Sequence, residues 1–341
     1  MNLQLFSGLP VHALSAAEFG AAECVLGGAR LGELTAGPVA SWPVQAVAAP
    51  LLGQSGGAIQ EIWQSATPCS AGVFEGIAWR RAGHLLYGVI ELEEAGFAAN
   101  AGHGALQAAS REAYRRIFRL LDCQGLPQLW RVWNYLAGIN EEVGGLERYR
   151  QFNIGRQDAF IEFARGATGN VPAACAIGLA GGPLSIAFLA GEQAALPVEN
   201  PRQISAYHYP AEYGPRSPTF SRGALVYPPG QEILFISGTA SIVGYRTVHP
   251  DDVVGQCRET MTNIAAVVGE ANRLCRSAAY VLDELSYRVY VRRAADFPQI
   301  RETLTALLGG RSEIVYLQAD ICRPDLLLEI EAMASHALGN C

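Results

Sequence analysis

Leu129-Trp130-Arg131-Val132-Trp133-Asn134-Tyr135-Leu136 is a stretch of large apolar and aromatic residues that favours a β-strand. A second stretch of this kind, Leu285-Ser286-Tyr287-Arg288-Val289-Tyr290-Val291-Arg292, lies further along the chain. Each stretch has a helix-like segment before it and another after it. These segments are residues 105–121 and 147–164 around the first stretch, and residues 251–272 and 295–308 around the second. The chain therefore contains an internal repeat.

The repeat extends beyond these elements. Each copy opens with a pair of strands and closes with a strand, turn and strand that include a proline. The opening pairs are residues 72–91 and 223–243, and the closing units are residues 173–190 and 313–334. In both copies the order is strand, strand, helix, strand, helix, strand, strand. A unit of this kind can form a mixed sheet with two helices on one face.

About 70 residues precede the first copy, and we interpret them as a degenerate third copy, since a domain usually needs more chain than this. The predicted fold class is therefore α/β (α+β), with domains at residues 1–70, 71–200 and 201–341. Residues 196–202, with two prolines and an asparagine, are typical of a boundary between domains. Chance matching of common elements is the alternative explanation of the repeat.

An acidic residue lies in the last strand of the second copy, within residues 326–333. Alternation along a strand puts Glu329 and Glu331 on one side and Leu328 and Ile330 on the other. A carboxyl group in apolar surroundings has a raised pKa and can remain protonated near neutral pH, as a general acid must. The alternative is a solvated face on an edge strand. In the first copy Phe188 lies five residues after a proline, as Glu329 does in the second, so only one copy carries the acid.

The composition excludes several classes of protein. Half of the residues are hydrophobic and the net charge is -7, with no run of Lys or Arg, so neither nucleic acid nor an anionic membrane is expected as a partner. Residues 171–191 carry no charge over a length that could cross a bilayer, but prolines and a Gly-Gly pair interrupt them, and we predict two buried strands joined by a tight turn. The eight cysteines show no metal-binding or disulfide spacing. We expect a cytoplasmic protein that binds no metal.

The second copy resembles the reactive-intermediate deaminase (Rid/YjgF) superfamily over residues 216–333. The resemblance rests on Phe235-Ile236-Ser237-Gly238, the helix that contains Gln256, Thr260 and Asn263, and Leu328-Glu329-Ile330-Glu331-Ala332. With Glu147 to Arg156, Tyr207-His208-Tyr209-Pro210, Tyr213 to Pro218 and Ala319 to Arg323 added, the whole chain resembles the chorismatases, in which one chain holds three such domains as a pseudo-trimer.

The resemblance implies cleavage of the enol ether of chorismate, with release of pyruvate and without a cofactor. It favours Glu329 over Glu331 as the general acid. Positions like Ala240 and Cys322 separate members that hydrolyse chorismate from members that form a hydroxybenzoate, and a cysteine resembles the second type. The expected product is 3-hydroxybenzoate, with 4-hydroxybenzoate as a further option. Cys322 could take part in the chemistry or only shape the pocket.

A dianionic substrate needs cations, and we select Arg156 and Arg216 for its carboxylates because a guanidinium meets both oxygens of a carboxylate. Arg216 lies between two prolines, which stiffen the backbone. Tyr149, Tyr207 and Tyr213 could supply hydroxyl groups and an aromatic wall. Three alternatives stay open: a chorismate hydrolase, a Rid-type deaminase of enamines or imines, and a ligand-binding module without activity. A pseudo-trimeric chain needs no partner subunit, so we expect a monomer.

Overall fold

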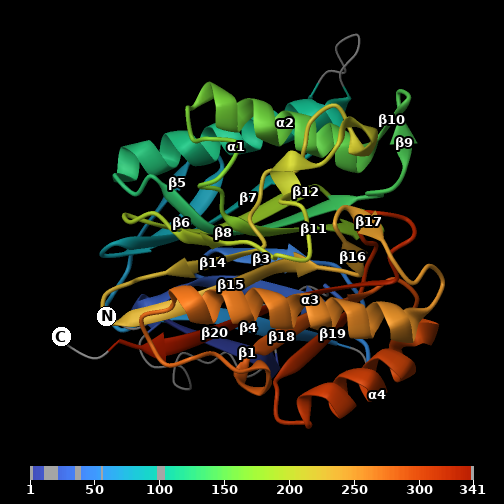
Figure 1. The fold of residues 1–341 in the computed structure, drawn as a ribbon. Helices are drawn as coiled ribbons and strands as arrows, with labels where there is room; N and C mark the ends of the chain where they lie inside the picture. The colour runs from blue at the N-terminus through green and yellow to red at the C-terminus, as the bar shows by residue number, and fades with distance from the viewer. Residues whose placement is uncertain (1–2, 11–21, 35–39, 55–56, 98–103, 339–341) are drawn as a thin grey trace.

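Three β-sheets make up the core of the protein in the computed structural model, which describes residues 3–10, 22–34, 40–54, 57–97 and 104–338 (Figure 1). The first sheet defines the N-terminal lobe. Its strands are β1 (Leu3–Pro10), β2 (Val25–Gly32), β3 (Val44–Val47) and β4 (Ala58–Ser65), in the order β1-β4-β2-β3.

The central lobe has a sheet of six strands in the order β11-β8-β12-β7-β6-β5, with two helices. Its elements are β5 (Ser70–Phe74), β6 (Ile77–Ala82), β7 (Leu85–Leu92), α1 (Ala105–Gln124), β8 (Gln128–Ala137), α2 (Arg148–Glu162), β11 (Ala173–Leu179) and β12 (Leu184–Gly191). A small hairpin of β9 (Glu142–Val143) and β10 (Leu146–Glu147) precedes α2. Helix α1 ends at Gln124 and is followed by Gly125, which adopts the left-handed conformation (φ 65°) typical of a residue after a helix.

The C-terminal lobe repeats this plan with a sheet in the order β13-β14-β15-β20-β18-β19. Its elements are β13 (Leu196–Val198), β14 (Gly223–Val226), β15 (Gln231–Thr239), α3 (Val253–Leu274), β18 (Ser286–Val291), α4 (Phe297–Leu308), β19 (Ile314–Gln318) and β20 (Leu328–Ala337). A second small hairpin is formed by β16 (Ile242–Val243) and β17 (Arg246–Thr247). Asp252 caps α3 by accepting a hydrogen bond from the backbone N of Gly255 at 2.9 Å.

Short 3-10 helices join these elements. They are η2 (Ala22–Cys24), η3 (Glu94–Gly96), η4 (Ala206–His208), η5 (Ala211–Tyr213), η6 (Leu282–Glu284) and η7 (Ala294–Asp296).

All three lobes share one arrangement of four strands. The orders β1-β4-β2-β3, β7-β12-β8-β11 and β15-β20-β18-β19 are equivalent, because in each the first three strands are antiparallel neighbours and the last pair is parallel. The described strands β1–β4 of the N-terminal lobe therefore share the strand topology of the two longer sheets. No α-helix occurs among the described residues of the N-terminal lobe.

The helices cover the outer faces of two sheets, and the inner faces of all three sheets meet. Apolar residues of α1 and α2 pack on β7, β8 and β12, and those of α3 and α4 pack on β15, β18 and β20. Figure 1 shows α1 and α2 at the top of the molecule and α4 at the bottom. Between them lies one large core that includes Trp63, Trp133 and Phe235 from the three lobes. The fold is thus an α+β arrangement with approximate threefold character.

Two details of the sequence prediction were wrong. Strands β11 and β12 do not pair with each other as a hairpin, because both pair with β8, which lies between them. Phe188 is not the counterpart of Glu329: Phe188 packs toward the helices, whereas Ser185 pairs with Tyr135 as Glu329 pairs with Tyr290. A comparison by distance from a proline missed this shift of register. The first copy still lacks the acid.

Strand β20 lies between β15 and β18, and the residues Glu329 and Glu331 are 4% and 5% exposed. The alternative of a solvated edge strand is therefore excluded. Among the described residues, no helix combines the length and the hydropathy needed to span a bilayer.

Four charged residues in the core form what we call the central ion-pair cluster: Glu61 on β4, Arg131 on β8, Arg288 on β18 and Glu331 on β20. Arg131 pairs with Glu331, and Arg288 pairs with Glu61 and, at 2.9 Å, with Glu331. Tyr290 also donates a hydrogen bond to Glu331 at 3.1 Å. Two cations and two anions from all three lobes are balanced in this way, and every one is less than 9% exposed. The cluster links the three lobes.

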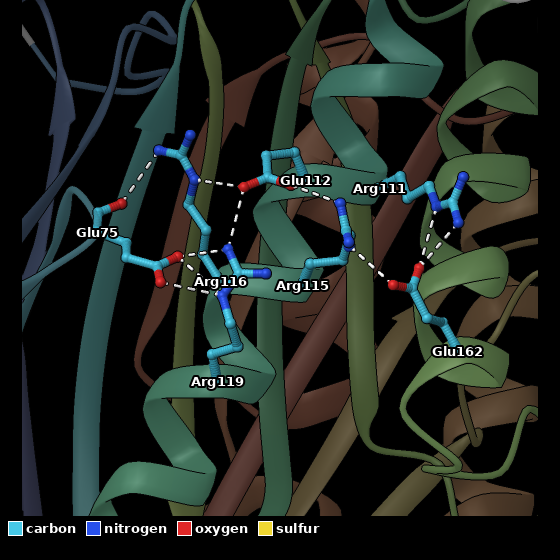
Figure 2. A network of polar contacts seen from close by, with 7 residues as sticks. All are labelled: Glu75, Arg111, Glu112, Arg115, Arg116, Arg119 and Glu162. Atoms are coloured by element: carbon cyan, nitrogen blue, oxygen red, sulfur yellow. Dashed lines mark hydrogen bonds and ion pairs between the residues drawn. The ribbon is translucent and has the colours of Figure 1, made fainter.

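A second set of ion pairs lies on the outer surface of the central lobe (Figure 2). Arg111 and Arg115 of α1 both bind Glu162 of α2, at 2.9 Å and 3.0 Å. Arg119 pairs with Glu75, in the turn between β5 and β6, and with Glu112. These pairs connect α1 to its neighbours, but water screens them.

The two sets predict opposite sensitivities to mutation. Arg288→Met removes one of two cations from the buried central ion-pair cluster and should lower stability by about 3–5 kcal/mol, because buried carboxylates lose a partner. Glu162→Gln removes two surface pairs and should cost less than about 1 kcal/mol. Thermal and urea unfolding of both variants would measure this. Equal losses in the two variants would contradict a special role for the cluster.

Candidate active site

A cavity of about 990 Å³ lies where the central lobe meets the C-terminal lobe. The central lobe contributes residues of the β9–β10 hairpin, α2 and β11 to its wall, and the C-terminal lobe contributes residues 209–222, the end of β15, the β16–β17 hairpin and residues 322–329. Hydrogen bonds join the lobes beside the cavity. Ser237 on β15 donates to the carbonyl of Ser221 at 2.6 Å and accepts from the backbone N of Ala174 on β11 at 2.9 Å.

Glu329 projects from β20 into this cavity. Opposite it, the pairing of β15 with β20 shifts register between Ile236 and Thr239, which is a β-bulge, and Gly238 lies within the bulge. A Cβ atom on Gly238 would lie 1.8 Å from Oε1 of Glu329. Gly238 is thus required for the carboxyl group to take this position.

The surroundings of Glu329 favour the protonated form. Burial, with the nearby charge of Glu331, raises the pKa of Glu329 from 4.5 to about 8, although Arg131, the Cys322 thiol and Arg222 act in the other direction. Gly238 and Cys175 are close to it, and the cavity wall includes three more small apolar residues: Ala174, Ala176 and Ala240. The site therefore holds a carboxylic acid that can donate a proton at neutral pH.

Cys322 lies next to this acid, with Sγ 3.9 Å from Oε2 of Glu329. Burial and the charge of Glu329 raise the pKa of the Cys322 thiol to about 12. At neutral pH the group is a neutral thiol and not a nucleophilic thiolate. This favours the shaping role among the two that the sequence left open.

Three arginines of the cavity wall have guanidinium nitrogens without a hydrogen-bond partner: Nε of Arg156, Nε of Arg222 and one terminal nitrogen of Arg323. Arg156 and Arg222 are only 2% and 4% exposed. Across the described residues, none of the three forms an ion pair with an acidic side chain. Buried unpaired cations of this kind suit an anionic ligand.

Protein groups hold these guanidinium groups in place. Arg156 donates to Oδ1 of Asn153 at 2.8 Å, and Arg222 donates at 2.7 Å to the carbonyl of Ile204 and to the hydroxyl of Tyr209. Arg323 donates to the carbonyl of Tyr245 at 2.8 Å and lies 4.2 Å from the ring centroid of Tyr213. The unpaired nitrogens are therefore fixed in advance of ligand binding.

Six of the eight residues predicted from the sequence line the cavity together: Tyr149, Arg156, Tyr213, Ala240, Cys322 and Glu329. The structure places the other two, Tyr207 and Arg216, outside the lining. Tyr207 lies in η4 and packs edge-on against His208, with 4.7 Å between the ring centroids. Arg216 is exposed, and its nearest carboxylate is Asp158 of α2 at 3.4 Å. The prolines around it stiffen the chain without directing it inward.

The sequence did not single out Cys175, Tyr209, Arg222, Gly238 or Arg323 for the site. Two of these had a usable signal: Arg222 is a charge directly before the apolar strand β14, and Arg323 follows Cys322. Cys175 lies in an alanine-rich strand with no sign of function. Glu331, the competing acid, is not in the cavity wall, because it belongs to the central ion-pair cluster.

Within the described ranges, no group of three or more His, Cys, Asp or Glu side chains is arranged to hold a metal ion.

The raised pKa of Glu329 makes stability depend on pH. Between pH 4.5 and about 8 the folded protein keeps a proton that the unfolded chain releases, so this group's contribution to stability falls as the pH rises. Glu329→Gln removes the effect, and the variant should become more stable than the parent by up to a few kcal/mol above pH 8. Thermal unfolding from pH 5 to pH 9 measures it. A constant difference across that range would mean that Glu329 is not a buried acid.

Comparisons with known proteins agree with the fold. Residues 61–190 match the model of the chorismatase FkbO/Hyg5-like N-terminal family. The chain is 39% identical to a chorismatase of Streptomyces hygroscopicus over 82% of this chain and 80% of that protein. It is 40% identical to a 3-hydroxybenzoate synthase of the same organism, over 67% of this chain and 70% of the relative. A chorismatase crystal structure at 1.08 Å resolution superposes with a TM-score of 0.86 and 35% identity over 98% of both chains. The chain belongs to the chorismatase family.

Proposed function

We propose that the chain cleaves the enolpyruvyl ether of chorismate to pyruvate and a hydroxybenzoate, with Glu329 as the general acid. The observation that carries this proposal is the buried acid at the wall of a cavity that also holds three unpaired arginines. The similarity of this chain to a 3-hydroxybenzoate synthase supports the choice of products.

The chemistry begins with transfer of the Glu329 proton to the methylene carbon of the enolpyruvyl group. This makes the ether carbon an oxocarbenium-like centre. The neighbouring ring hydroxyl then attacks the ring carbon that carries the ether oxygen and gives its proton to the Glu329 carboxylate. An epoxide forms, the bond between that ring carbon and the ether oxygen breaks, and the electrons of the broken bond complete the carbonyl of pyruvate. One carbon–oxygen bond of the epoxide then opens, and transfer of a proton from the ring carbon that keeps the oxygen to that oxygen restores aromaticity. Pyruvate and hydroxybenzoate together contain all atoms of chorismate, so no water is consumed.

The small apolar groups in the cavity wall support this route over hydrolysis. Ala174, Cys175, Ala176 and Ala240 offer no charged or amide group to hold a water molecule beside the reacting carbons, and the Cys322 thiol is a weak hydrogen-bond partner. We assign Cys322 a role in excluding water.

We further propose that Arg156, Arg222 and Arg323 bind the two carboxylates of chorismate, in place of the expected pair Arg156 and Arg216, while Tyr149 and Tyr213 form part of the wall. One chain supplies both sides of the cavity, which supports a monomer. The seven described cysteines are free thiols, which suits the reducing cytoplasm.

Incubation of the purified protein with chorismate should release equal amounts of pyruvate and a hydroxybenzoate, identified by chromatography and mass spectrometry.

Glu329→Gln should lower kcat by about 100- to 10,000-fold, because the proton donor is lost while the shape remains. Cys322→Ser should shift part of the product to a dihydroxycyclohexadiene carboxylate, since a hydroxyl can hold a water molecule. Pyruvate accompanied only by this diol in the parent protein would show that the protein is a hydrolase.

Arginine variants test the binding assignment. Arg323→Gln should raise KM for chorismate by about 10- to 100-fold, because a charge-assisted contact to a carboxylate is lost. Arg216→Gln is the matched control, since Arg216 is exposed outside the cavity lining, and its KM should stay within about twofold of the parent value. Steady-state kinetics at one ionic strength measure both. A larger effect at Arg216 than at Arg323 would restore the assignment made from the sequence.

A further inference from the structure

Glu331 lies two residues from Glu329 on the same face of β20, but it has no contact with the cavity. Its carboxylate is fixed by Arg131, by Arg288 at 2.9 Å and by the hydroxyl of Tyr290 at 3.1 Å. These three partners hold the negative charge of Glu331 in a fixed position two residues from Glu329.

The central ion-pair cluster is balanced without Glu329. Glu61 and Glu331 supply two negative charges, and Arg131 and Arg288 supply two positive charges. An ionised Glu329 would therefore be a third buried carboxylate beside a cluster that has only two guanidinium groups. Burial of an uncompensated charge is costly, and protonation avoids the cost.

Other charged and titratable groups face the two carboxyl groups from every packed element. Glu329 is faced by Arg131 from β8, Arg222 from the segment before β14, Cys322 from the loop before β20 and Tyr149 from α2. Cys175 of β11 is close to both acids, and Tyr135 of β8 is close to Glu331. Only Glu331 is an acid among these neighbours. Arg131 and Arg222 act in the opposite sense, and neither forms an ion pair with Glu329 among the described contacts.

We propose that Glu331, held by Arg131 and Arg288, is a positioning residue that keeps Glu329 in its acid form and so sets the upper pH limit of the reaction. The pH limit of the reaction rests on the proposed function, but the proton on Glu329 can be measured without turnover. Residues of all three lobes form the ion pairs that hold Glu331, so assembly of the three lobes affects the protonation of Glu329.

The first test is an infrared titration of the ligand-free protein. The stretching band of a protonated carboxyl group that is absent in Glu329→Gln belongs to Glu329. In Glu331→Gln the midpoint of that band should move to lower pH by about one unit or more, because the neighbouring negative charge is gone. Glu331→Asp keeps the charge and should restore most of the parent midpoint. An unchanged midpoint in Glu331→Gln would overturn the proposal.

Glu61→Gln is the matched control, since it removes a carboxylate from the same cluster but from the distant side of Arg288. It should lower thermal stability without a comparable movement of the midpoint. An equal movement in Glu61→Gln would show a general effect of charge and refute a specific role of Glu331.

If Glu331→Gln does not fold, Arg131→Gln carries the test, because loss of that cation should move the midpoint to higher pH. Movement to lower pH, or no movement, would contradict the proposal.

Kinetics provide the second readout. The basic limb of the kcat/KM profile for chorismate should move in parallel with the infrared midpoint in each variant. A parent protein that shows the band but releases no pyruvate would refute the proposed function and leave the inference standing. If the parent protein is active but the basic limb and the infrared midpoint are unchanged in Glu331→Gln, the proposed function stands and the inference about Glu331 is refuted.

Discussion

The central ion-pair cluster is the constraint on which the structure depends. Two arginines and two glutamates, all nearly inaccessible to water, come from β4, β8, β18 and β20, and Glu61 of the N-terminal lobe and Arg131 of the central lobe find their partners in the C-terminal lobe. Replacing a whole buried ion pair by apolar groups is often harmless, whereas removing one partner is not. The cluster therefore contributes specificity of assembly: the sheets must meet in one register for each charge to find its partner. The same register places β11 against β15 and creates the cavity.

Much of the fold could be predicted from the sequence because strands and helices are local patterns. The strand and helix patterns of residues 129–136 and 147–164 correspond to β8 and α2 within one or two residues. Pairing is not local, and for that reason the hairpin expected within residues 171–191 was wrong. In both complete copies a strand from earlier in the chain lies between the last two strands, and no turn signal reports this.

The site shows the same division. Glu329 could be found because a carboxyl group in an apolar strand is an anomaly in the sequence itself. The arginines could not be ranked in that way, since an arginine is common on surfaces and its direction depends on how a loop folds. Arg216 and Arg222 are six residues apart, yet one is exposed beside α2 and the other is buried in the cavity wall. Burial of Arg222 follows from its place at the start of β14, which is a property of the sheet.

A duplicated scaffold offers equivalent positions, and their differences explain why one seam holds a buried acid. Tyr135 and Tyr290 occupy equivalent places in the two complete copies and share a hydrogen bond of 2.6 Å in the core. The strand partner of Tyr290 is Glu329, whereas the partner of Tyr135 is Ser185, whose hydroxyl is engaged by Gln45 at 3.2 Å. A neutral hydroxyl can be satisfied in a closed seam. A carboxyl group there must be paired or protonated, and the bulge at Gly238 leaves space for a protonated carboxyl group. The protonated carboxyl group of Glu329 thus follows from one difference between equivalent positions, combined with one irregularity in the neighbouring strand.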